Sequence, residues 1–589
     1  MLTTLSSVKI IWMNAKIPAS LKILQYIFIS VLTPLSILFT QNLINSIEVF
    51  VGGIGSRDHI VLYLSLLIIS MLFISGNSFF DEILNIELRK SINKNLTFVI
   101  INKFCAVDYP CFEDSEIADT MQRMGDTPHD KILNVFLESL NTFAVLVSIL
   151  GTAIIFMQVS LWFSLSFVAI LAPMLWLDFK AVNMMNTMFN LQSEQERKLD
   201  YFSDLLGDKH TLLELKVFNA TEYILDKWRG INKKVLDERL KTTILSQKYF
   251  AISTVLTILW VANVIFSLIQ AIGVASISIG TFIVLIGAAG TVLTQSQTLS
   301  RCFSSLSQQS LEVKHYHKFM DLPEINSIAE KHSLIGQPRI AFEDVHFAYP
   351  QTGKQILNGV SFEVLPNQKV ALVGENGAGK STIIKLLCKL YKPDKGKITI
   401  NGVDLNDISY SQLSKVISVV FQEYFNYSLT IRENVALSSI DRLYEDESIM
   451  DTINKSLGVG AVNKFKSGLN TSLGKIEDDS VDLSGGEWQK IAIARALFSE
   501  SDFVVLDEPT AALDPIAEND LYNSFIQVLN KKGCVIISHR LASARLADNI
   551  IVFKDGRVEE QGEHSFLMDR KGLYYSMFTS QSAWYRQLS

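Results

Sequence analysis

The sequence predicts an α-helical membrane domain followed by an α/β domain that holds phosphates. Hydrophobic residues make up 48% of the 589 residues, and most of this excess lies before about residue 300. No Asp, Glu, Lys or Arg occurs in 23–47, 60–80, 139–177 or 249–300. After residue 339, short apolar runs alternate with helical patterns, which is typical of an α/β domain with a parallel sheet.

The charge-free stretches predict six transmembrane helices. A helix that crosses a bilayer needs about 20 apolar residues, so the first two stretches fit one crossing each and the longer third and fourth fit two each. We expect the turns of the longer stretches near Gln158–Ser160 and Gly273–Ser278. The predicted spans are about 23–47, 60–80, 136–157, 161–180, 249–271 and 279–300.

The basic residues indicate the orientation. The first external loop, at about 48–58, offers only Arg57, whereas 81–131 and 179–248 are rich in Lys and Arg. Because positive residues remain in the cytoplasm, both termini and the α/β domain are expected there. The sequence thus predicts a multi-pass protein of the plasma membrane.

Composition argues against several other classes of protein. The net charge of −7 gives no argument for a nucleic-acid partner. The five cysteines form no Cys-x-x-Cys pair, which argues against a zinc site or a disulfide framework. From residues 1–22 we expect neither a cleavable signal nor an N-terminal peptidase domain.

The connections between the spans suggest long cytoplasmic extensions of the helices. Glu194–Leu206 and Tyr223–Lys248 are amphipathic, so the membrane helices are expected to continue into the cytosol. Mixed polarity returns after residue 300, and Pro323, Gly336 and Pro338 mark a break. We therefore predict a transmembrane domain at 1–325, a linker at 326–338 and an α/β domain at 339–589.

Several amides lie within the predicted spans. Such groups seek partners inside the bundle or line a cavity, so two interpretations stay open: hydrogen bonds between helices, which we favour for any single residue, or a cargo pathway. No charged residue is expected near the middle of the membrane. The candidates are Gln41, Asn42, Asn45, Asn77, Asn263, Gln270, Gln295 and Gln297.

A phosphate-binding loop is the first motif of the α/β domain. The apolar strand 369–373 runs directly into a glycine-rich segment, and a helix is expected from Ile383. In this context the backbone N–H groups converge on phosphates, Lys380 reaches the β- and γ-phosphates, and Ser381 ligates Mg²⁺. The loop comprises Gly374, Glu375, Asn376, Gly377, Ala378, Gly379, Lys380, Ser381 and Thr382.

Two carboxylates follow a second apolar run, Phe503–Leu506. We expect Asp507 to support Mg²⁺, directly or through water, and Glu508 to act as the general base that orients the attacking water. The runs expected as strands are Ile340–Tyr349, Lys369–Val373, Val416–Phe421, Phe503–Leu506, Val535–Ser538 and Ile550–Phe553.

The order of these motifs resembles the ATP-binding-cassette (ABC) exporters. The resemblance implies that Tyr349 stacks on adenine, that Gln422 senses Mg²⁺ and the membrane domain, and that His539 contacts the γ-phosphate. It also implies that Ser484, Gly485, Gly486 and Glu487 form the signature that covers ATP held by another subunit, at the start of a helix at 487–498. The segments Tyr109–Glu116 and Gly207–Asn219 resemble the coupling regions of that family, although they also fit solvated turns.

The resemblance implies a function and leaves the cargo open. It implies ATP and Mg²⁺ as cofactors, a homodimer, contact with membrane lipids, and ATP hydrolysis coupled to export. The motif sequences of the α/β domain, including Phe421–Tyr424 and Asp507–Pro515, are similar to those of nisin-type lantibiotic exporters. This resemblance implies a peptide or other amphipathic cargo. It also implies peptide-modification enzymes as further partners. The alternatives are a lipid or multidrug exporter and, less favoured, an ATP-gated regulator or channel.

Two positions depart from the family pattern. The fifth signature residue is Glu487, where Gln is commoner, and we expect this change to be tolerated. The stretch Ile476–Asp482 is acidic and lacks the glycine-rich pattern usual in multidrug and lipid exporters, which puts the details of coupling in doubt.

Overall fold

The computed structural model describes residues 2–53, 55–124, 127–157, 161–273, 278–325, 334, 336–350, 352–508, 532–538 and 541–586. These residues form two compact units, which are described separately. The first comprises Met1–Val107 and Ser115–Leu322, and the second comprises Asp108–Asp114 and Pro323–Ser589. The second unit therefore includes a short segment that the sequence places between two membrane helices.

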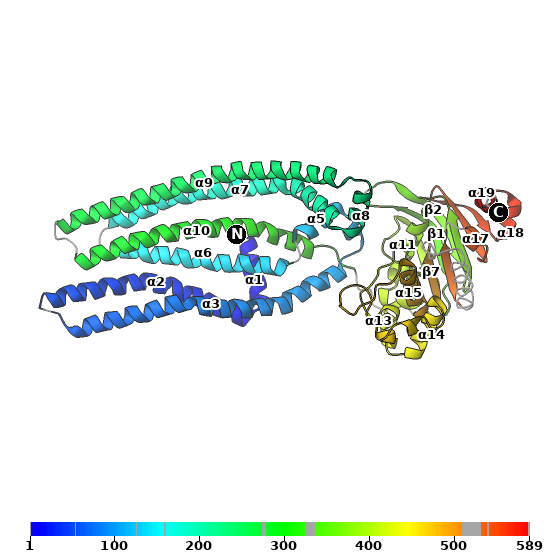
Figure 1. The fold of residues 1–589 in the computed structure, drawn as a ribbon, viewed down its shortest axis with the longest axis horizontal. Helices are drawn as coiled ribbons and strands as arrows, with labels where there is room; N and C mark the ends of the chain where they lie inside the picture. The colour runs from blue at the N-terminus through cyan, green and yellow to red at the C-terminus, as the bar shows by residue number, and fades with distance from the viewer. Residues whose placement is uncertain are drawn as a thin grey trace. The chain divides into compact units, whose positions relative to one another are not determined.

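The first unit is built of long helices. It contains α1 (Leu2–Asn14), α2 (Lys16–Val51), α3 (Arg57–Ala106), α5 (Ser115–Met124), α6 (Pro128–Met157), α7 (Leu161–Gly207), α8 (Lys209–Val217), α9 (Thr221–Gly273) and α10 (Ile279–Met320). Figure 1 shows α2 beside α3, α6 beside α10 and α7 beside α9. The segments 194–206 and 223–248 lie in α7 and α9, so these helices continue beyond the predicted spans as expected.

Five helices in the described part of the chain are long and apolar enough to cross a membrane. They are Lys16–Val51, Arg57–Ala106, Pro128–Met157, Thr221–Gln270 and Gly280–Met320. The predicted span at 161–180 lies in α7, where several side chains fall outside the described residues. The predicted turn at 158–160 also falls outside them, and so do residues 274–277 of the turn predicted at Gly273–Ser278.

Close packing within this unit depends on small residues and on amides. A Cβ atom at Gly151 of α6 would lie 2.6 Å from Cγ of Pro34 in α2, so the two helices approach through the missing side chain. Gln41 of α2 donates to Thr281 of α10 at 3.1 Å, and Ser278 donates to Asn45 at 2.7 Å. Gln41 and Asn45, two of the candidate pathway residues, therefore make hydrogen bonds between helices.

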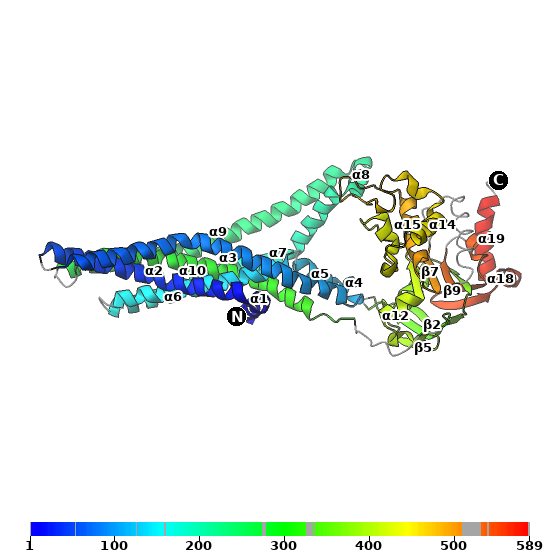
Figure 2. The ribbon, with the colours of Figure 1, turned by 90° about the horizontal axis from the view of Figure 1, so that it is seen from below.

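The second unit has two sheets (Figure 2). The smaller, in the order β2-β1-β4-β5, is antiparallel and contains β1 (Ile340–Ala348), β2 (Gln355–Val364), β4 (Lys395–Ile400) and β5 (Val403–Asp404). The larger has the order β10-β9-β3-β8-β7-β6, with β3 (Lys369–Gly374), β6 (Ile417–Val420), β7 (Phe503–Asp507), β8 (Gly533–Ile537), β9 (Asn549–Lys554) and β10 (Arg557–Gly562).

The expected parallel sheet is confirmed for five of the six predicted runs, since β9, β3, β8, β7 and β6 pair in parallel. The first run was expected in the same sheet, and that was wrong. It forms β1, which pairs antiparallel with β2 and β4, because two nearby strands that the sequence did not signal provide its partners.

Helices cover the larger sheet and form a separate lobe. These helices are α4 (Pro110–Glu113), α11 (Lys380–Leu387), α12 (Tyr410–Val416), α13 (Ile431–Ala436), α14 (Asp446–Leu457), α15 (Gly485–Phe498), α17 (Leu541–Ala544), α18 (His564–Arg570) and α19 (Leu573–Arg586). Short 3-10 turns occupy Leu405–Asp407, Ile440–Arg442, Ala461–Lys464 and Gly468–Asn470. The helix expected from Ile383 begins at Lys380 instead, and the helix expected from Glu487 begins at Gly485.

Candidate functional site

The phosphate loop lies between β3 and α11, at the carboxyl edge of the larger sheet. Its glycines are needed for its shape. Gly374 has φ 150°, and a Cβ there would lie 2.3 Å from the carbonyl oxygen of Phe553. Gly379 caps α11 with φ 101°, in the left-handed region that favours glycine. The strand–loop–helix context that makes the motif credible is therefore present.

Lys380 folds back into this loop. Its ammonium group donates to the carbonyl oxygens of Gly374 and Glu375, both at 2.9 Å, and the residue is 6% exposed. Burial lowers the pKa of Lys380, although the carboxylates of Glu508 and Asp507 favour the charged form. A cation is thus held where the loop's backbone N–H groups can converge on phosphates.

Asp507 ends β7 as a buried carboxyl group. It is 5% exposed, and burial, reinforced by the charge of Glu508, raises its pKa to about 6, while the Ser381 hydroxyl and Lys380 act in the opposite direction. Among the described residues, its Oδ1 atom is buried and has no hydrogen-bond partner. An uncompensated carboxylate oxygen beside a hydroxyl fits a divalent cation with a preference for oxygen ligands, so Asp507 and Ser381 suit Mg²⁺.

Glu508 occupies a strained backbone position next to Asp507. Its φ is 48°, which costs a residue other than glycine on the order of 1–3 kcal/mol. Its N–H donates to the carbonyl oxygen of Ile537 at 3.0 Å, which holds the turn against β8. The amide of Gln422 donates to Glu508 Oε2 at 3.3 Å. The structure thus brings together two residues that the sequence predicted for the catalytic step.

Tyr349 lies beside the phosphate loop. Its hydroxyl is 3.2 Å from that of Thr382, and the rings of Phe347 and Tyr391 meet its ring edge-on at 5.1 and 5.4 Å. The ammonium of Lys385 lies 5.2 Å from the centre of the Tyr349 ring. The aromatic predicted to stack on adenine is therefore held next to the loop that would hold the phosphates.

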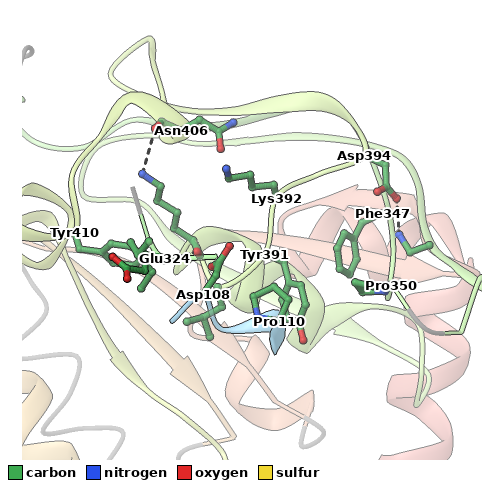
Figure 3. A pocket seen from close by; sticks show the side chains of 14 residues that line it. Asp108, Pro110, Glu324, Phe347, Pro350, Tyr391, Lys392, Asp394, Asn406 and Tyr410 are labelled. Carbon is green, nitrogen blue, oxygen red and sulfur yellow. Dashed lines mark hydrogen bonds between the residues drawn. The ribbon is translucent and has the colours of Figure 1, made fainter. Parts of the chain in front are cut away.

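The short helix α4 packs against this aromatic group. The carboxylate of Glu113 accepts hydrogen bonds from the Tyr391 hydroxyl and, at 3.2 Å, from Lys385. A cavity of about 440 Å³ lies beside them, and its lining includes Asp108, Pro110, Phe347 and Tyr391 (Figure 3). The segment that resembles the first coupling region thus contacts the residues around Tyr349. The second such segment, Gly207–Asn219, contains α8, whose side chains are not buried.

The predicted signature forms the start of α15. Ser484 caps the helix: its hydroxyl accepts from the N–H of Glu487 at 3.4 Å, and its N–H donates to the Glu487 carboxylate at 3.0 Å. Lys464 pairs with the same carboxylate and, together with the bonds from Ser484, holds the pKa of Glu487 at about 2. Glutamate therefore has a local structural role at this unusual position.

The signature and the phosphate loop do not meet within the described part of this chain. The carbonyl oxygen of Gly485 accepts from the Tyr424 hydroxyl at 2.9 Å, and the side chains of Ser484 and Glu487 bond to each other's residue and to Lys464. His539 and the segment 509–515 lie outside the described residues.

Sequence reasoning missed the partners of these residues. Lys464, Lys385 and Glu113 were not singled out for the site, although Glu113 lay in the segment recognised by resemblance. For Lys385 a signal existed, since it lies on the short helix that follows the phosphate loop. For Lys464 the sequence offered none, because its pairing depends on how the helical lobe folds.

Comparison with known proteins agrees with this geometry. A sequence model described as ABC transporter matches residues 357–511. The chain is an ABC transporter ATPase. A solved structure of a bacterial Atm1-family ABC exporter with ATP bound superposes with a TM-score of 0.77 at 20% identity and covers 96% of this chain and 98% of its own. The helical unit followed by the nucleotide-binding unit is therefore the fold of that exporter.

Curated relatives of this transporter ATPase span nearly its whole length. The subtilin transport ATP-binding protein SpaT of Bacillus subtilis is 29% identical over 574 residues, which is 95% of this chain and 91% of the relative. The nisin transport ATP-binding protein NisT of Lactococcus lactis subsp. lactis is 28% identical over 94% of this chain and 92% of its own. An ATP-dependent lipid A-core flippase of Aromatoleum aromaticum is 28% identical over 79% and 78%.

Proposed function

We propose that this ABC exporter moves a lantibiotic-like peptide from the cytoplasm to the outside and works as a homodimer. The main support for a peptide cargo is the share of the chain that the similarity covers. Two relatives named for subtilin and nisin transport match 95% and 94% of this chain, helical unit included, whereas the flippase of similar identity matches 79%. Cargo specificity resides in the helical unit, so coverage of that unit bears on it most directly.

In the proposed cycle, Tyr349 stacks on adenine while the loop 374–382 and Lys380 hold the phosphates. Glu508, oriented by Gln422, holds the attacking water and accepts its proton. His539 contacts the γ-phosphate. Ser381, Asp507 and Gln422 would hold Mg²⁺, which supplies charge neutralisation to the transferred phosphoryl group.

The homodimer follows from the position of the signature. Because Ser484–Glu487 contact Lys464 and Tyr424 rather than the phosphate loop, a second copy would bring its own signature to the ATP held here. ATP would then join two nucleotide-binding units and hydrolysis would separate them. Directed transport requires that the cargo bind the two states with different affinity. We place both termini and this unit in the cytoplasm, from the basic residues between the predicted spans.

The test is transport by proteoliposomes that contain the full chain and carry the nucleotide-binding units outside. The probe is the nisin precursor with its leader attached, and uptake that requires both ATP and Mg²⁺ is the expected result. The matched control is Glu508→Gln, which should bind ATP and transport nothing. Absence of uptake by a preparation that hydrolyses ATP would contradict the peptide cargo.

The second candidate is a lipid or multidrug exporter. It is favoured by the flippase relative and by a 34% identical match to a multidrug resistance protein of Entamoeba histolytica, which covers 50% of this chain and 24% of that protein. ATPase stimulation by lipids or hydrophobic drugs, without response to the peptide, would support this alternative.

A further inference from the structure

A polar cavity lies inside the helical unit, in the part of the predicted spans nearest the cytoplasm. It has a volume of about 300 Å³ and is lined by residues of α2, α3, α6 and α10. Four amide side chains, one from each helix, contribute to its lining, together with the hydroxyl groups of Tyr26 and Ser148. The four amides are Gln25, Asn77, Asn141 and Gln295.

The lining of this amide cavity carries no Asp, Glu, Lys or Arg among the described residues. Lys22 of α2 is fully buried, and its ammonium group lies 5.6 Å from the centre of the ring of Tyr26, which lines the cavity. Its ammonium group is paired with Asp81 at 2.7 Å, so its charge is compensated. A ligand of this cavity is therefore uncharged where it touches these walls, because an unpaired charge buried there would be costly.

In two of these amides the NH₂ group has a hydrogen-bond partner and the oxygen has none among the described residues. The Gln25 NH₂ group donates to Asn77 Oδ1 at 2.7 Å, and that of Gln295 donates to the Ser148 hydroxyl at 2.6 Å. Among the described residues, Oε1 of Gln25 and Oε1 of Gln295 are buried and have no hydrogen-bond partner. Two residues that line the cavity thus each keep an acceptor without a donor.

The orientation of the Gln25 amide follows from its neighbours. Its NH₂ group lies 2.7 Å from Asn77 Oδ1 and 3.5 Å from the Asn77 carbonyl oxygen, and a backbone carbonyl can only accept. Turning the amide over would bring three oxygens together. The unsatisfied atom is therefore the acceptor, and a buried acceptor without a partner costs free energy until a donor reaches it.

We propose that the amide cavity binds a stretch of the exported peptide through its backbone N–H groups, an inference that rests on the proposed peptide cargo. Backbone N–H groups are neutral donors, which both unsatisfied acceptors require, and they occur at every residue except proline. Acyl chains offer no donor and would leave Gln25 Oε1 and Gln295 Oε1 unpaired. Recognition of this kind depends on hydrogen bonds to the backbone of the cargo and therefore tolerates changes in its side chains.

The experiment measures the binding of fluorescently labelled nisin precursor to the full chain in lipid nanodiscs without ATP. Gln25→Met and Gln295→Met each remove one amide, its acceptor oxygen and its NH₂ donor together, at nearly constant volume. Each should raise Kd by about threefold to tenfold, since a hydrogen bond of this type contributes a small net free energy, and the double variant should raise it further. Basal ATP hydrolysis should stay within about twofold of the parent and reports that the protein is folded.

The matched control is Gln297→Met, an amide on the same helix that is exposed and outside the cavity. Its Kd should stay within about twofold. If the glutamine variants fail to fold, Ala144→Leu serves instead, because Ala144 lines the cavity and a larger apolar side chain would take up part of it and should raise Kd for the peptide.

Tight binding by the double variant, while the parent protein binds the peptide, would overturn the cavity assignment and leave the proposed function intact. Equal losses in Gln295→Met and Gln297→Met would also overturn it, since the cargo would then contact α10 without using the cavity. A parent protein that binds no peptide would overturn the proposed cargo, and this inference with it.

Discussion

The carboxylate of Glu113 accepts a hydrogen bond from the ammonium group of Lys385 at 3.2 Å. Glu113 ends α4, in a segment that the sequence places between two membrane helices, and Lys385 lies on the helix that begins with Lys380 of the phosphate loop. Lys385 also covers the Tyr349 ring. One ion pair therefore links the connection between the predicted spans to the aromatic proposed to hold adenine.

This relationship predicts coupling between the two residues in nucleotide binding. Both are partly exposed, at 32% for Lys385 and 42% for Glu113, so the ion pair contributes about 0.2–1 kcal/mol. Lys385→Met and Glu113→Gln should each change the Kd for ATP by about twofold to fivefold, and the double variant should change it by less than the product. Isothermal titration of the four proteins would check this, and strictly multiplicative effects would rule out the coupling.

Glu508→Gln should separate nucleotide binding from turnover. The amide keeps the shape of the side chain and its contact with Gln422, and it loses the ability to accept a proton, so hydrolysis should fall by about 10²–10⁴-fold while Kd for ATP changes little. Phosphate release and nucleotide binding, measured on the same nanodisc preparation, would check this. A variant that hydrolyses ATP at the parent rate would show that another group is the base.

Asp507→Asn should stabilise the fold when Mg²⁺ is absent. Burial raises the Asp507 pKa to about 6, so this group lowers the stability as pH rises from about 4 to 6 and keeps it lowered above that. The neutral amide removes the penalty. In EDTA at pH 8 the variant should therefore melt at a higher temperature than the parent, and added Mg²⁺ with nucleotide should stabilise only the parent. A lower melting temperature of the variant in EDTA would contradict this assignment.

The Glu487–Lys464 pair predicts acid sensitivity in the helical lobe. The Glu487 pKa is held at about 2, chiefly by Lys464, so the carboxylate contributes stability that is present above its ordinary value near 4.5 and is lost as pH falls from there toward 2. Glu487→Gln removes that contribution. The difference in melting temperature between parent and variant should shrink between pH 6 and pH 3, and a difference independent of pH would argue against the pair.

Local sequence patterns were enough to predict much of the nucleotide site. The phosphate loop, the Asp507–Glu508 pair and the helix opened by Ser484 are contiguous in sequence, so strand, turn and cap signals define them without knowledge of distant residues. The charge-free stretches predicted the long helices for a similar reason, because a helix in a bilayer must satisfy its own backbone.

Contacts between residues far apart in the chain could not be predicted from local sequence patterns. The antiparallel sheet around β1 was missed because β2 and β4 carry weak strand signals, and pairing between strands is set by packing and register rather than by propensity. The contacts of Gln422 with Glu508 and of Glu113 with Lys385 join residues that only folding brings together.

The sequence by itself therefore determined the type of domain, the chemistry of the phosphate loop and the presence of long apolar helices, since each depends on residues close together in the chain. Tertiary structure decided which side chains meet: the unsatisfied oxygen of Asp507 beside Ser381, the Lys464 partner of Glu487, and the four amides around one cavity. The physical reason is that burial and hydrogen bonding depend on distances across the fold, and these distances follow from the packing of the whole unit.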